Sequence, residues 1–205
     1  MKNVAIIPAR AGSERIKNKN LQKIGGKTLI ELAIRRAAKL DGIILSTDYS
    51  EEQLWEAGVP EPKFMDHCYR IMSRPPHLAT SDTKTIDVLL DIAGQIDADY
   101  ITVLQPTSPM ITADDVDRAR LWLGEHNALV SVCVAHKHLR VIEYGSIVQR
   151  NVVRVTGGIY MIRVCTLLTE RTLFPQECLP YFIPERKAID IDTIEDLTYA
   201  RGNYR

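Results

Sequence analysis

The sequence predicts an α/β fold in which a mostly parallel sheet is covered by helices on both faces. Short apolar runs rich in β-branched residues alternate along the chain with longer segments whose apolar residues recur at helical spacing. This alternation is typical of parallel sheets, because each crossover between parallel strands needs a helix-sized connection. The 205 residues contain no repeat, low-complexity tract or linker, so we expect a single domain over residues 1–205.

Compact apolar runs bounded by polar residues mark the predicted strands. The run that begins at residue 100 is ended by a loop with prolines at positions 106 and 109, and proline cannot donate to a strand ladder. The predicted strands are residues 4–8, 42–45, 100–104, 128–134 and 157–162. Residues 139–149 alternate around a turn at Tyr144, Gly145 and Ser146, so we expect a short hairpin, and residues 139–154 are the segment predicted to project from the domain.

Helical periodicity appears between these runs. Thr112 is a predicted N-cap, with Asp114 and Asp115 in the first turn where negative charge suits the helix dipole, and Gly124 is the expected stop. The predicted helices are residues 28–40, 85–96, 112–123 and 193–201.

Composition excludes several classes of function. Lys and Arg number 26, as do Asp and Glu, so the formal net charge is zero and neither a general nucleic-acid binder nor a polybasic membrane-surface protein is expected. No run approaches the ~18 apolar residues of a membrane span, and we see no secretory signal pattern. Cys68, Cys133, Cys165 and Cys178 lack metal-site spacing, so we expect reduced thiols in a cytoplasmic protein.

The loop behind the first strand carries the strongest chemical signal. The stretch IIPARAGSERIKNKN combines a Gly/Ser turn with the cations Arg10, Arg15, Lys17 and Lys19. Backbone N–H groups in a concave loop and positive side chains both favour a polyphosphate. The stretch is neither a GxxxxGK[ST] loop nor a GxGxxG loop, and a solvated basic turn is an equally good interpretation of the loop alone.

Two further segments have the composition of a ligand site. Asp190 and Asp192 point to the same side if their segment is an extended strand end, and such a pair suits Mg²⁺ beside substrate phosphates. Taken alone, the pair is better interpreted as solubilising charge on an edge strand. Gln105 follows a central strand, where open α/β sheets bind ligands, although a rigid connection with a surface amide is the alternative.

Together these segments resemble the acylneuraminate cytidylyltransferase family. The matching pieces, in family order, are IIPARAGSERIKNKN, STD at residues 46–48, RPPHLATSDTKTIDVL, LQPTSP, GGIY and IDIDTIEDL. The resemblance implies a Rossmann-like nucleotidyltransferase fold, and transfer of CMP from CTP to an acidic sugar with release of pyrophosphate. It also implies Mg²⁺ as the cofactor.

The resemblance further implies roles for individual residues. The nucleotide is expected to lie on a set of loop residues and donors, namely Ala9, Arg10, Ala11, Gly12, Ser13, Lys19, Asn20, Arg74, Thr83 and Thr85. The sugar pocket is expected to contain Gln105, Tyr160 and Phe174. The catalytic set is expected to be Arg10, Lys19, Asp190 and Asp192, with Lys19 on the α-phosphate charge and the two aspartates on Mg²⁺.

The acceptor and the assembly stay open at the level of sequence. Only about twenty residues separate Val134 from Thr156, where sialate enzymes carry a long extension that reaches a partner subunit. The segment 139–154 is therefore a shortened projecting or dimerisation segment, and a homodimer is an open expectation. A different acid, such as a phosphonate, is an alternative acceptor. A non-catalytic nucleotide-binding homologue is a further alternative, which the retained Lys19 and aspartate pair disfavour.

Overall fold

The fold is that of a computed structural model, which describes residues 1–64, 69–143 and 146–204, with only the backbone described at 64, 136–143 and 146–151. Seven of the described strands form one sheet in the order β5-β4-β1-β6-β8-β7-β9, and β8 alone among them runs antiparallel to its neighbours. These strands are β1 (Asn3–Ala9), β4 (Gly42–Thr47), β5 (Tyr69–Ser73), β6 (Tyr100–Val103), β7 (Ala128–Glu143), β8 (Ser146–Arg163) and β9 (Cys178–Phe182). The predicted fold class is confirmed.

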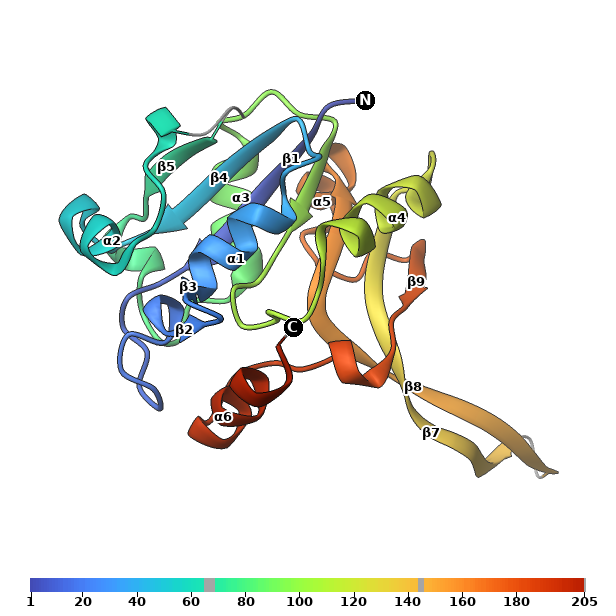
Figure 1. The fold of residues 1–205 in the computed structure, drawn as a ribbon. Helices are drawn as coiled ribbons and strands as arrows, with labels where there is room; N and C mark the ends of the chain where they lie inside the picture. The colour runs from blue at the N-terminus through green and yellow to red at the C-terminus, as the bar shows by residue number, and fades with distance from the viewer. Residues whose placement is uncertain (65–68, 144–145, 205) are drawn as a thin grey trace.

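Helices cover both faces of this sheet (Figure 1). They are α1 (Leu29–Arg36), α2 (Glu51–Ala57), α3 (Thr85–Ala93), α4 (Ala113–Leu123), α5 (Val164–Glu170) and α6 (Ile194–Asn203). Short 3₁₀ turns lie at η1 (Lys19–Leu21), η2 (Pro62–Phe64), η3 (Pro76–Leu78) and η4 (Glu185–Lys187), and β2 (Lys23–Ile24) pairs with β3 (Lys27–Thr28). No helix in the described ranges has both the length and the apolar character needed to cross a bilayer.

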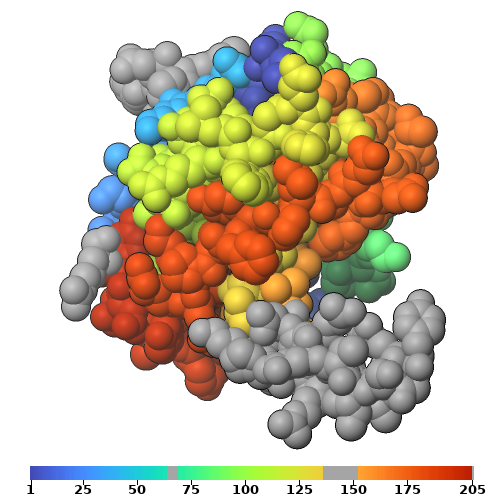
Figure 2. Space-filling model, turned by 90° about the vertical axis from the view of Figure 1, so that its right-hand side faces the viewer, coloured from blue at the N-terminus to red at the C-terminus, as the bar shows by residue number. Residues whose placement is uncertain are grey.

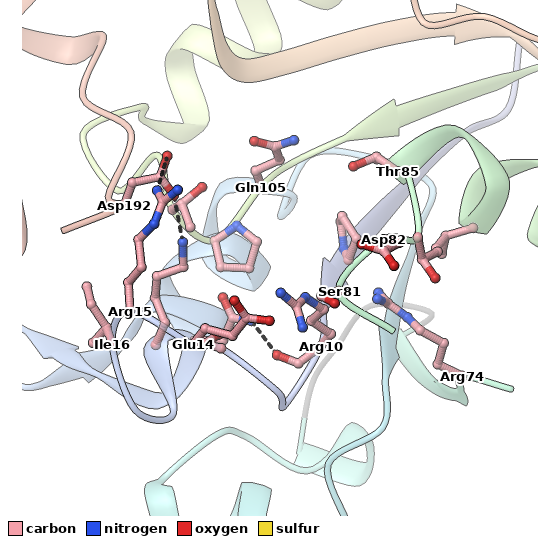
Figure 3. A pocket seen from close by; sticks show the side chains of 18 residues that line it. Arg10, Glu14, Arg15, Ile16, Arg74, Ser81, Asp82, Thr85, Gln105 and Asp192 are labelled. Atoms are coloured by element: carbon pink, nitrogen blue, oxygen red, sulfur yellow. Dashed lines mark hydrogen bonds and ion pairs between the residues drawn. The ribbon is translucent and has the colours of Figure 1, made fainter. Parts of the chain in front are cut away.

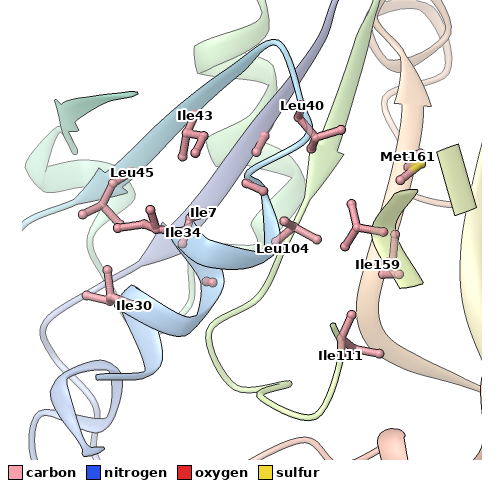
Figure 4. Packing of buried hydrophobic residues seen from close by; sticks show 14 of the residues in the cluster. Ile7, Ile30, Ile34, Leu40, Ile43, Leu45, Leu104, Ile111, Ile159 and Met161 are labelled. Atoms are coloured by element: carbon pink, nitrogen blue, oxygen red, sulfur yellow. The ribbon is translucent and has the colours of Figure 1, made fainter. Parts of the chain in front are cut away.

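The core is divided between the two faces because successive side chains of a strand point in opposite directions. Ala5 and Ile7 of β1 pack in one cluster with Ile34 of α1, which also contains residues of α2 and α4. Figure 4 shows Ile30 and Ile34 lying over the strands on this face. Val4 and Ile6 face the opposite cluster, beneath α3 and α5. Burial on both faces explains why β1 is apolar throughout rather than alternating.

Most predicted elements are present. The differences lie mainly at the ends of the helices and at the edges of the sheet. The helix predicted over 112–123 is α4, with Thr112 as its N-cap and Gly124 after its last residue. The helices predicted to reach residues 40 and 96 end earlier, at Arg36 and Ala93. The sequence reasoning missed two helices, α2 and α5, and two strands, β5 and β9, which form the edges of the sheet.

The hairpin of β7 and β8 is longer than predicted. Paired backbone continues from the sheet to Glu143 and Ser146, and the hairpin extends away from the body of the molecule (Figure 1). The predicted turn residues Tyr144 and Gly145 lie outside the described residues. On the side shown in Figure 2, α4 (yellow-green) and the segment that follows β8 (orange to red) form the surface. Cys133, Cys165 and Cys178 are free thiols, and Cys68 lies outside the described residues.

Candidate active site

A cavity of about 620 Å³ opens at the carboxyl ends of β1 and β6, and we call it the β1–β6 cavity. The strand order reverses here, because β4 and β5 extend the sheet on one side of β1 while β6 pairs on the other. Open α/β sheets bind their ligands at this kind of position, since the loops leaving the two strands diverge. The location therefore identifies the cavity as the candidate site before its side chains are considered.

Most of the sequence-predicted residues meet in this cavity (Figure 3). The predicted residues that line it are Arg10, Ser13, Lys19, Asn20, Arg74, Thr83, Thr85, Gln105 and Asp192. They come from the loop after β1, the segment after β5, the start of α3, the loop after β6 and the loop before α6. Because the segment after β5 runs directly into α3, four distant stretches of the chain are thus brought to one end of the sheet.

The loop after β1 is held by its own hydrogen bonds. Asn20 is buried, and its Nδ2 donates to the carbonyl oxygen of Arg10 at 2.9 Å. The backbone N–H of Ala11 donates to Asp48 at 2.8 Å, and that of Ser13 donates to the carbonyl oxygen of Ala11 at 2.8 Å. These two N–H groups are therefore occupied, and the side-chain cations carry more of the loop's anion-binding capacity than its backbone does.

Arg74 lies deep in the cavity wall, with 8% of its surface exposed. Its Nη2 donates to the carbonyl oxygen of Ser46 at 3.0 Å, and its Nε lies 3.4 Å from the Ser46 hydroxyl. Burial lowers the pKa of the Arg74 guanidinium, while Asp48 acts to raise it and Arg10 to lower it further. The STD motif thus has two structural roles: Ser46 orients Arg74, and Asp48 closes the loop after β1.

Lys19 joins the loop after β1 to the segment before α6. Its Nζ lies 3.0 Å from Oδ1 of Asp192 and donates to the carbonyl oxygen of Ile191 at 2.9 Å. Arg15 approaches the other carboxylate oxygen of Asp192 at 3.9 Å. The Lys19 side chain is 19% exposed and that of Asp192 is 56% exposed, so the carboxylate still faces solvent.

The interpretation of residues 189–192 as a strand end is wrong, because they form an irregular segment before α6. The backbone is tied to the loop after β6 instead, where the N–H of Ile191 donates to the carbonyl oxygen of Thr107 at 2.8 Å. The two aspartates are nevertheless neighbours. Desolvation by the surrounding protein raises the pKa of Asp190, although the Asp190 side chain is still partly exposed to water. A hydrogen bond from Thr107 lowers this pKa, and the negative charge of Asp192 raises it further.

A second group of residues lies where β8 approaches the cavity. Gln105 belongs to the cavity lining, whereas Gly157, Tyr160 and Asp190 lie beside it. A bulge in β8 places Gly157 at a φ of 74°, where an added Cβ would lie 3.0 Å from Oε1 of Gln105 and 3.6 Å from Oδ2 of Asp190. Tyr160 is buried and meets Phe174 edge-on, with 6.0 Å between ring centroids. Burial raises the pKa of Tyr160, and the Asp190 charge adds to this. We call Gln105, Gly157, Tyr160 and Asp190 the β8 group.

Other sequence-predicted residues have no surface in the cavity. Ala9 is fully buried in the core, and neither Ala11 nor Gly12 lines the cavity, although both belong to the loop that forms its edge. Arg15, predicted only as one of the loop cations, also lines the cavity. Sequence reasoning missed several other lining residues, namely Pro8, Glu14, Ile16, Ser81, Asp82, Val88, Pro106 and Thr107. Most are adjacent in sequence to predicted residues, and that adjacency is the signal that pointed to them.

Comparison with known proteins identifies the class and then the family. A basic cavity at the reversal point of a mostly parallel sheet is typical of nucleotide-binding α/β proteins. Residues 4–153 match the family model described as cytidylyltransferase, and this chain belongs to that family of nucleotidyltransferases. The resemblance to acylneuraminate cytidylyltransferases seen in the sequence is thereby confirmed.

Individual relatives are similar over nearly their whole length. The pseudaminic acid cytidylyltransferase of Campylobacter jejuni subsp. jejuni serotype O:2 is 26% identical, with 100% of this chain and 97% of that protein covered. The CMP-N,N'-diacetyllegionaminic acid synthase of Legionella pneumophila is 25% identical, with 94% and 92% covered. The solved structure of a CMP:2-keto-3-deoxy-manno-octonic acid synthetase complexed with CTP shares the fold, with a TM-score of 0.66, 17% identity and 98% of each chain covered.

Proposed function

We propose that this chain transfers CMP from CTP to the hydroxyl of a nonulosonic acid and releases pyrophosphate. The observation that carries the proposal is the β1–β6 cavity, where cations for a triphosphate lie next to the β8 group. Its volume of about 620 Å³ is within the range of small-molecule sites. Relatives named for pseudaminic and diacetyllegionaminic acids indicate the class of acceptor.

The loop after β1 is suited to hold the triphosphate. Arg10 and Lys19 line the cavity with Ser13, and Arg15 adds a further cation at its edge. Phosphoryl transfer depends mostly on positioning and charge neutralisation, so fixed cations are sufficient and no His or Cys nucleophile is required. We assign the α-phosphate charge of the transition state to Lys19, whose ammonium lies in the cavity lining 3.0 Å from the Asp192 carboxylate.

The opposite side of the cavity is suited to hold the nucleoside. Arg74, Thr83 and Thr85 present donors and acceptors from the segment after β5 and the start of α3. Asn20 uses its amide N–H to fix the loop after β1, and its place in the lining leaves its amide oxygen as an acceptor near the ribose and base. We infer that cytosine recognition uses these side chains.

The β8 group is suited to hold the acceptor. Gln105 and Tyr160 supply an amide and a phenol, and Phe174 supplies an aromatic edge beside Tyr160. An acceptor placed there has its hydroxyl next to the phosphates. The hydroxyl loses its proton, its oxygen bonds to the α-phosphorus, and the bond from the α-phosphorus to the bridging oxygen breaks as pyrophosphate leaves with the electron pair.

Asp190 and Asp192 would hold Mg²⁺. Mg²⁺ is commonly bound by one or two carboxylates together with substrate phosphates and water. The donor set fits, because the two carboxylates are close enough for Asp192 to raise the pKa of Asp190. In the described ranges no cluster of three or more metal-binding side chains occurs, which suits an ion that completes its coordination with phosphates and water. When bound, the ion neutralises phosphate charge.

The test is pyrophosphate release from CTP and Mg²⁺ over a panel of nonulosonic acids and phosphonates. We expect turnover with at least one nonulosonic acid, and loss of turnover in Asp192→Ala without loss of the cooperative thermal transition. Glu195→Ala, an exposed carboxylate three residues further along, is the matched control and should retain activity. Turnover with phosphonates alone, or CTP binding without any turnover, would contradict the proposal. Full Mg²⁺-dependent activity in Asp192→Ala would overturn the metal assignment.

A further inference from the structure

A second cavity, of about 580 Å³, lies on the other side of the loop that follows β6. Its walls come from α1, the start of α4, η4 and the end of α6, and we call it the α1–α6 cavity. Gln105, Pro106 and Thr107 line the β1–β6 cavity, whereas Pro109, Met110 and Ile111 line this one. One loop therefore separates two cavities, and the function proposed above leaves the second unused.

The walls of the α1–α6 cavity combine apolar surface with positive charge. Leu32, Met110, Ile111, Tyr199 and Tyr204 supply aliphatic and aromatic surface. Five of the fourteen lining residues are Lys or Arg, and none is Asp or Glu. The cavity therefore differs chemically from the β1–β6 cavity, which contains Glu14, Asp82 and Asp192 beside its cations.

Two of these cations already have partners. Arg35 donates to Glu31 at 2.9 Å, and the Lys187 ammonium lies 2.5 Å from Asp115. Lys27 and Arg186 make no ion pair or side-chain hydrogen bond with any residue that the structure describes. The cavity thus retains two cations that are not neutralised locally.

Arg36 adds a third charge, at the base of the cavity. It is 4% exposed, and its guanidinium donates to the carbonyl oxygens of Ser108 at 2.5 Å and Gln105 at 2.8 Å, while its Nε has no partner in the described structure. Burial lowers the pKa of Arg36 to about 10. A buried guanidinium is usually accompanied by a carboxylate, because removing a charge from water is costly. Arg36 has two neutral backbone carbonyl oxygens where such a carboxylate would be expected.

We propose that the α1–α6 cavity binds a small organic anion with an apolar body, such as an aromatic carboxylate or sulfonate. The apolar walls accept the ring system, and the anionic group supplies the counter-charge that Lys27, Arg186 and Arg36 lack. We expect CTP to bind in the β1–β6 cavity, where the triphosphate is placed above, and to leave the α1–α6 cavity free. The inference does not depend on the acceptor or the reaction proposed above.

The test uses 8-anilino-1-naphthalenesulfonate, an apolar anion whose fluorescence rises in apolar sites. We expect saturable binding of one equivalent to the folded chain, and we expect saturating CTP to leave it in place. The variant Lys27→Gln/Arg186→Gln should weaken binding about tenfold, since it removes two attractive charges. Uncharged N-phenyl-1-naphthylamine should bind the wild type and this variant equally well.

Two further variants test whether the probes bind in the α1–α6 cavity itself. Arg70→Gln/Arg118→Gln removes the same charge from exposed positions outside the cavity and should bind the sulfonate as the wild type does. Ala113→Trp places an indole in the cavity mouth and should abolish binding of both probes while thermal unfolding stays cooperative. Unchanged sulfonate affinity in Lys27→Gln/Arg186→Gln would overturn the proposal, as would complete displacement of the probe by CTP. A change in oligomeric state of that variant without a change in affinity would also overturn it, because a second copy would then cover the cavity.

Discussion

Lys19 and Asp192 belong to segments far apart in sequence, yet their charged groups lie 3.0 Å apart in the cavity lining. With both partners near solvent, such a pair contributes little to stability. Its importance is chemical, because the ammonium and the carboxylate occupy the region where a triphosphate and a divalent ion would meet. The pair holds the two side chains in the site when it contains no substrate.

Replacing Lys19 tests its assigned role. We expect Lys19→Met to lower kcat/KM by about 10²–10³, the usual effect of removing one donor aimed at transition-state charge. The measurement is pyrophosphate release at saturating Mg²⁺. Lys17→Met removes an exposed cation from the same loop and is the matched control. A loss in Lys19→Met no larger than in Lys17→Met would refute the assignment.

Gly157 permits a close approach that no other residue allows. Its φ of 74° lies in the left-handed region, and an added Cβ would lie 3.0 Å from Oε1 of Gln105. We expect Gly157→Ala to displace the Gln105 amide, raising KM for the acceptor at least tenfold while the affinity for CTP changes little. Steady-state kinetics with titration calorimetry separates the two effects. Gly94→Ala, with no atom within 4 Å of an added Cβ, is the control.

At the scale of elements, the start of α6 fixes the segment that carries Asp192. Thr193 is the N-cap, and its hydroxyl accepts from the N–H of Asp196 at 3.2 Å. The Asp196 carboxylate accepts in return from the N–H groups of Thr193 at 2.8 Å and Asp192 at 3.0 Å. The N–H of Thr193 is the main cause that lowers the pKa of Asp196. Burial opposes it, and the N–H of Asp192 and the Thr193 hydroxyl lower the pKa further.

This capping arrangement predicts a pH-dependent contribution to stability. Because the pKa of Asp196 is lowered in the folded state, its contribution is present above the unfolded value of about 4 and is lost as pH falls through the folded pKa. We expect Asp196→Ala to unfold at lower urea concentration than the wild type, by an equal amount at pH 7 and pH 5. The difference should shrink below about pH 4. Glu195→Ala is the control, and a difference that grows with acid would contradict the assignment.

What the sequence could predict at this scale depends on burial. β1, β4 and β6 are central strands with both faces covered, so they appear as apolar runs. β5 and β9 are edge strands with mixed burial, and β9 contains Pro180, so neither has a recognisable pattern. The capping box of α2 at Ser50 and Gln53 was an available signal that the prediction did not use.

What the sequence could predict about the site depends on whether a feature is local or joins distant parts of the chain. The motifs predicted half of the side chains that line the β1–β6 cavity, because each follows a strand or lies next to a helix start. The bond from Ala11 to Asp48 and the placement of Arg36 behind Gln105 could not be predicted. Both join residues more than thirty positions apart, and their geometry depends on the packed sheet.

At the scale of the whole molecule, the hairpin of β7 and β8 is the part most separate from the core. The side chains of Lys137, Arg140 and Arg150 lie outside the described residues. At the hairpin base, Val153 and Val155 of β8 and Phe182 of β9 are 41–58% exposed, on the two strands that flank β7. We propose that the chain is a homodimer and that this surface is part of its interface.

Shortening the hairpin tests this arrangement. Replacing residues 137–151 by a two-residue Asn-Gly turn should leave cooperative unfolding and CTP affinity unchanged, because the β1–β6 cavity contains no residue of the hairpin. With Val153→Ser, Val155→Ser and Phe182→Ser added to this variant, we expect the mass in sedimentation equilibrium to fall from about twice 23.2 kDa to that of a single chain. Loss of CTP binding would contradict the proposed separation, and an unchanged dimer would refute the interface.

The antiparallel direction of β8 has a consequence for how this family of enzymes changes over time. A strand that runs against its neighbours enters the sheet at the edge where they end, so Gly157 and Tyr160 lie on the same continuous stretch of chain as the hairpin. Residues can be gained or lost at the hairpin end without changing the strand order of the sheet or the loop after β1. The proposed acceptor site can therefore diverge while the proposed triphosphate site is inherited unchanged.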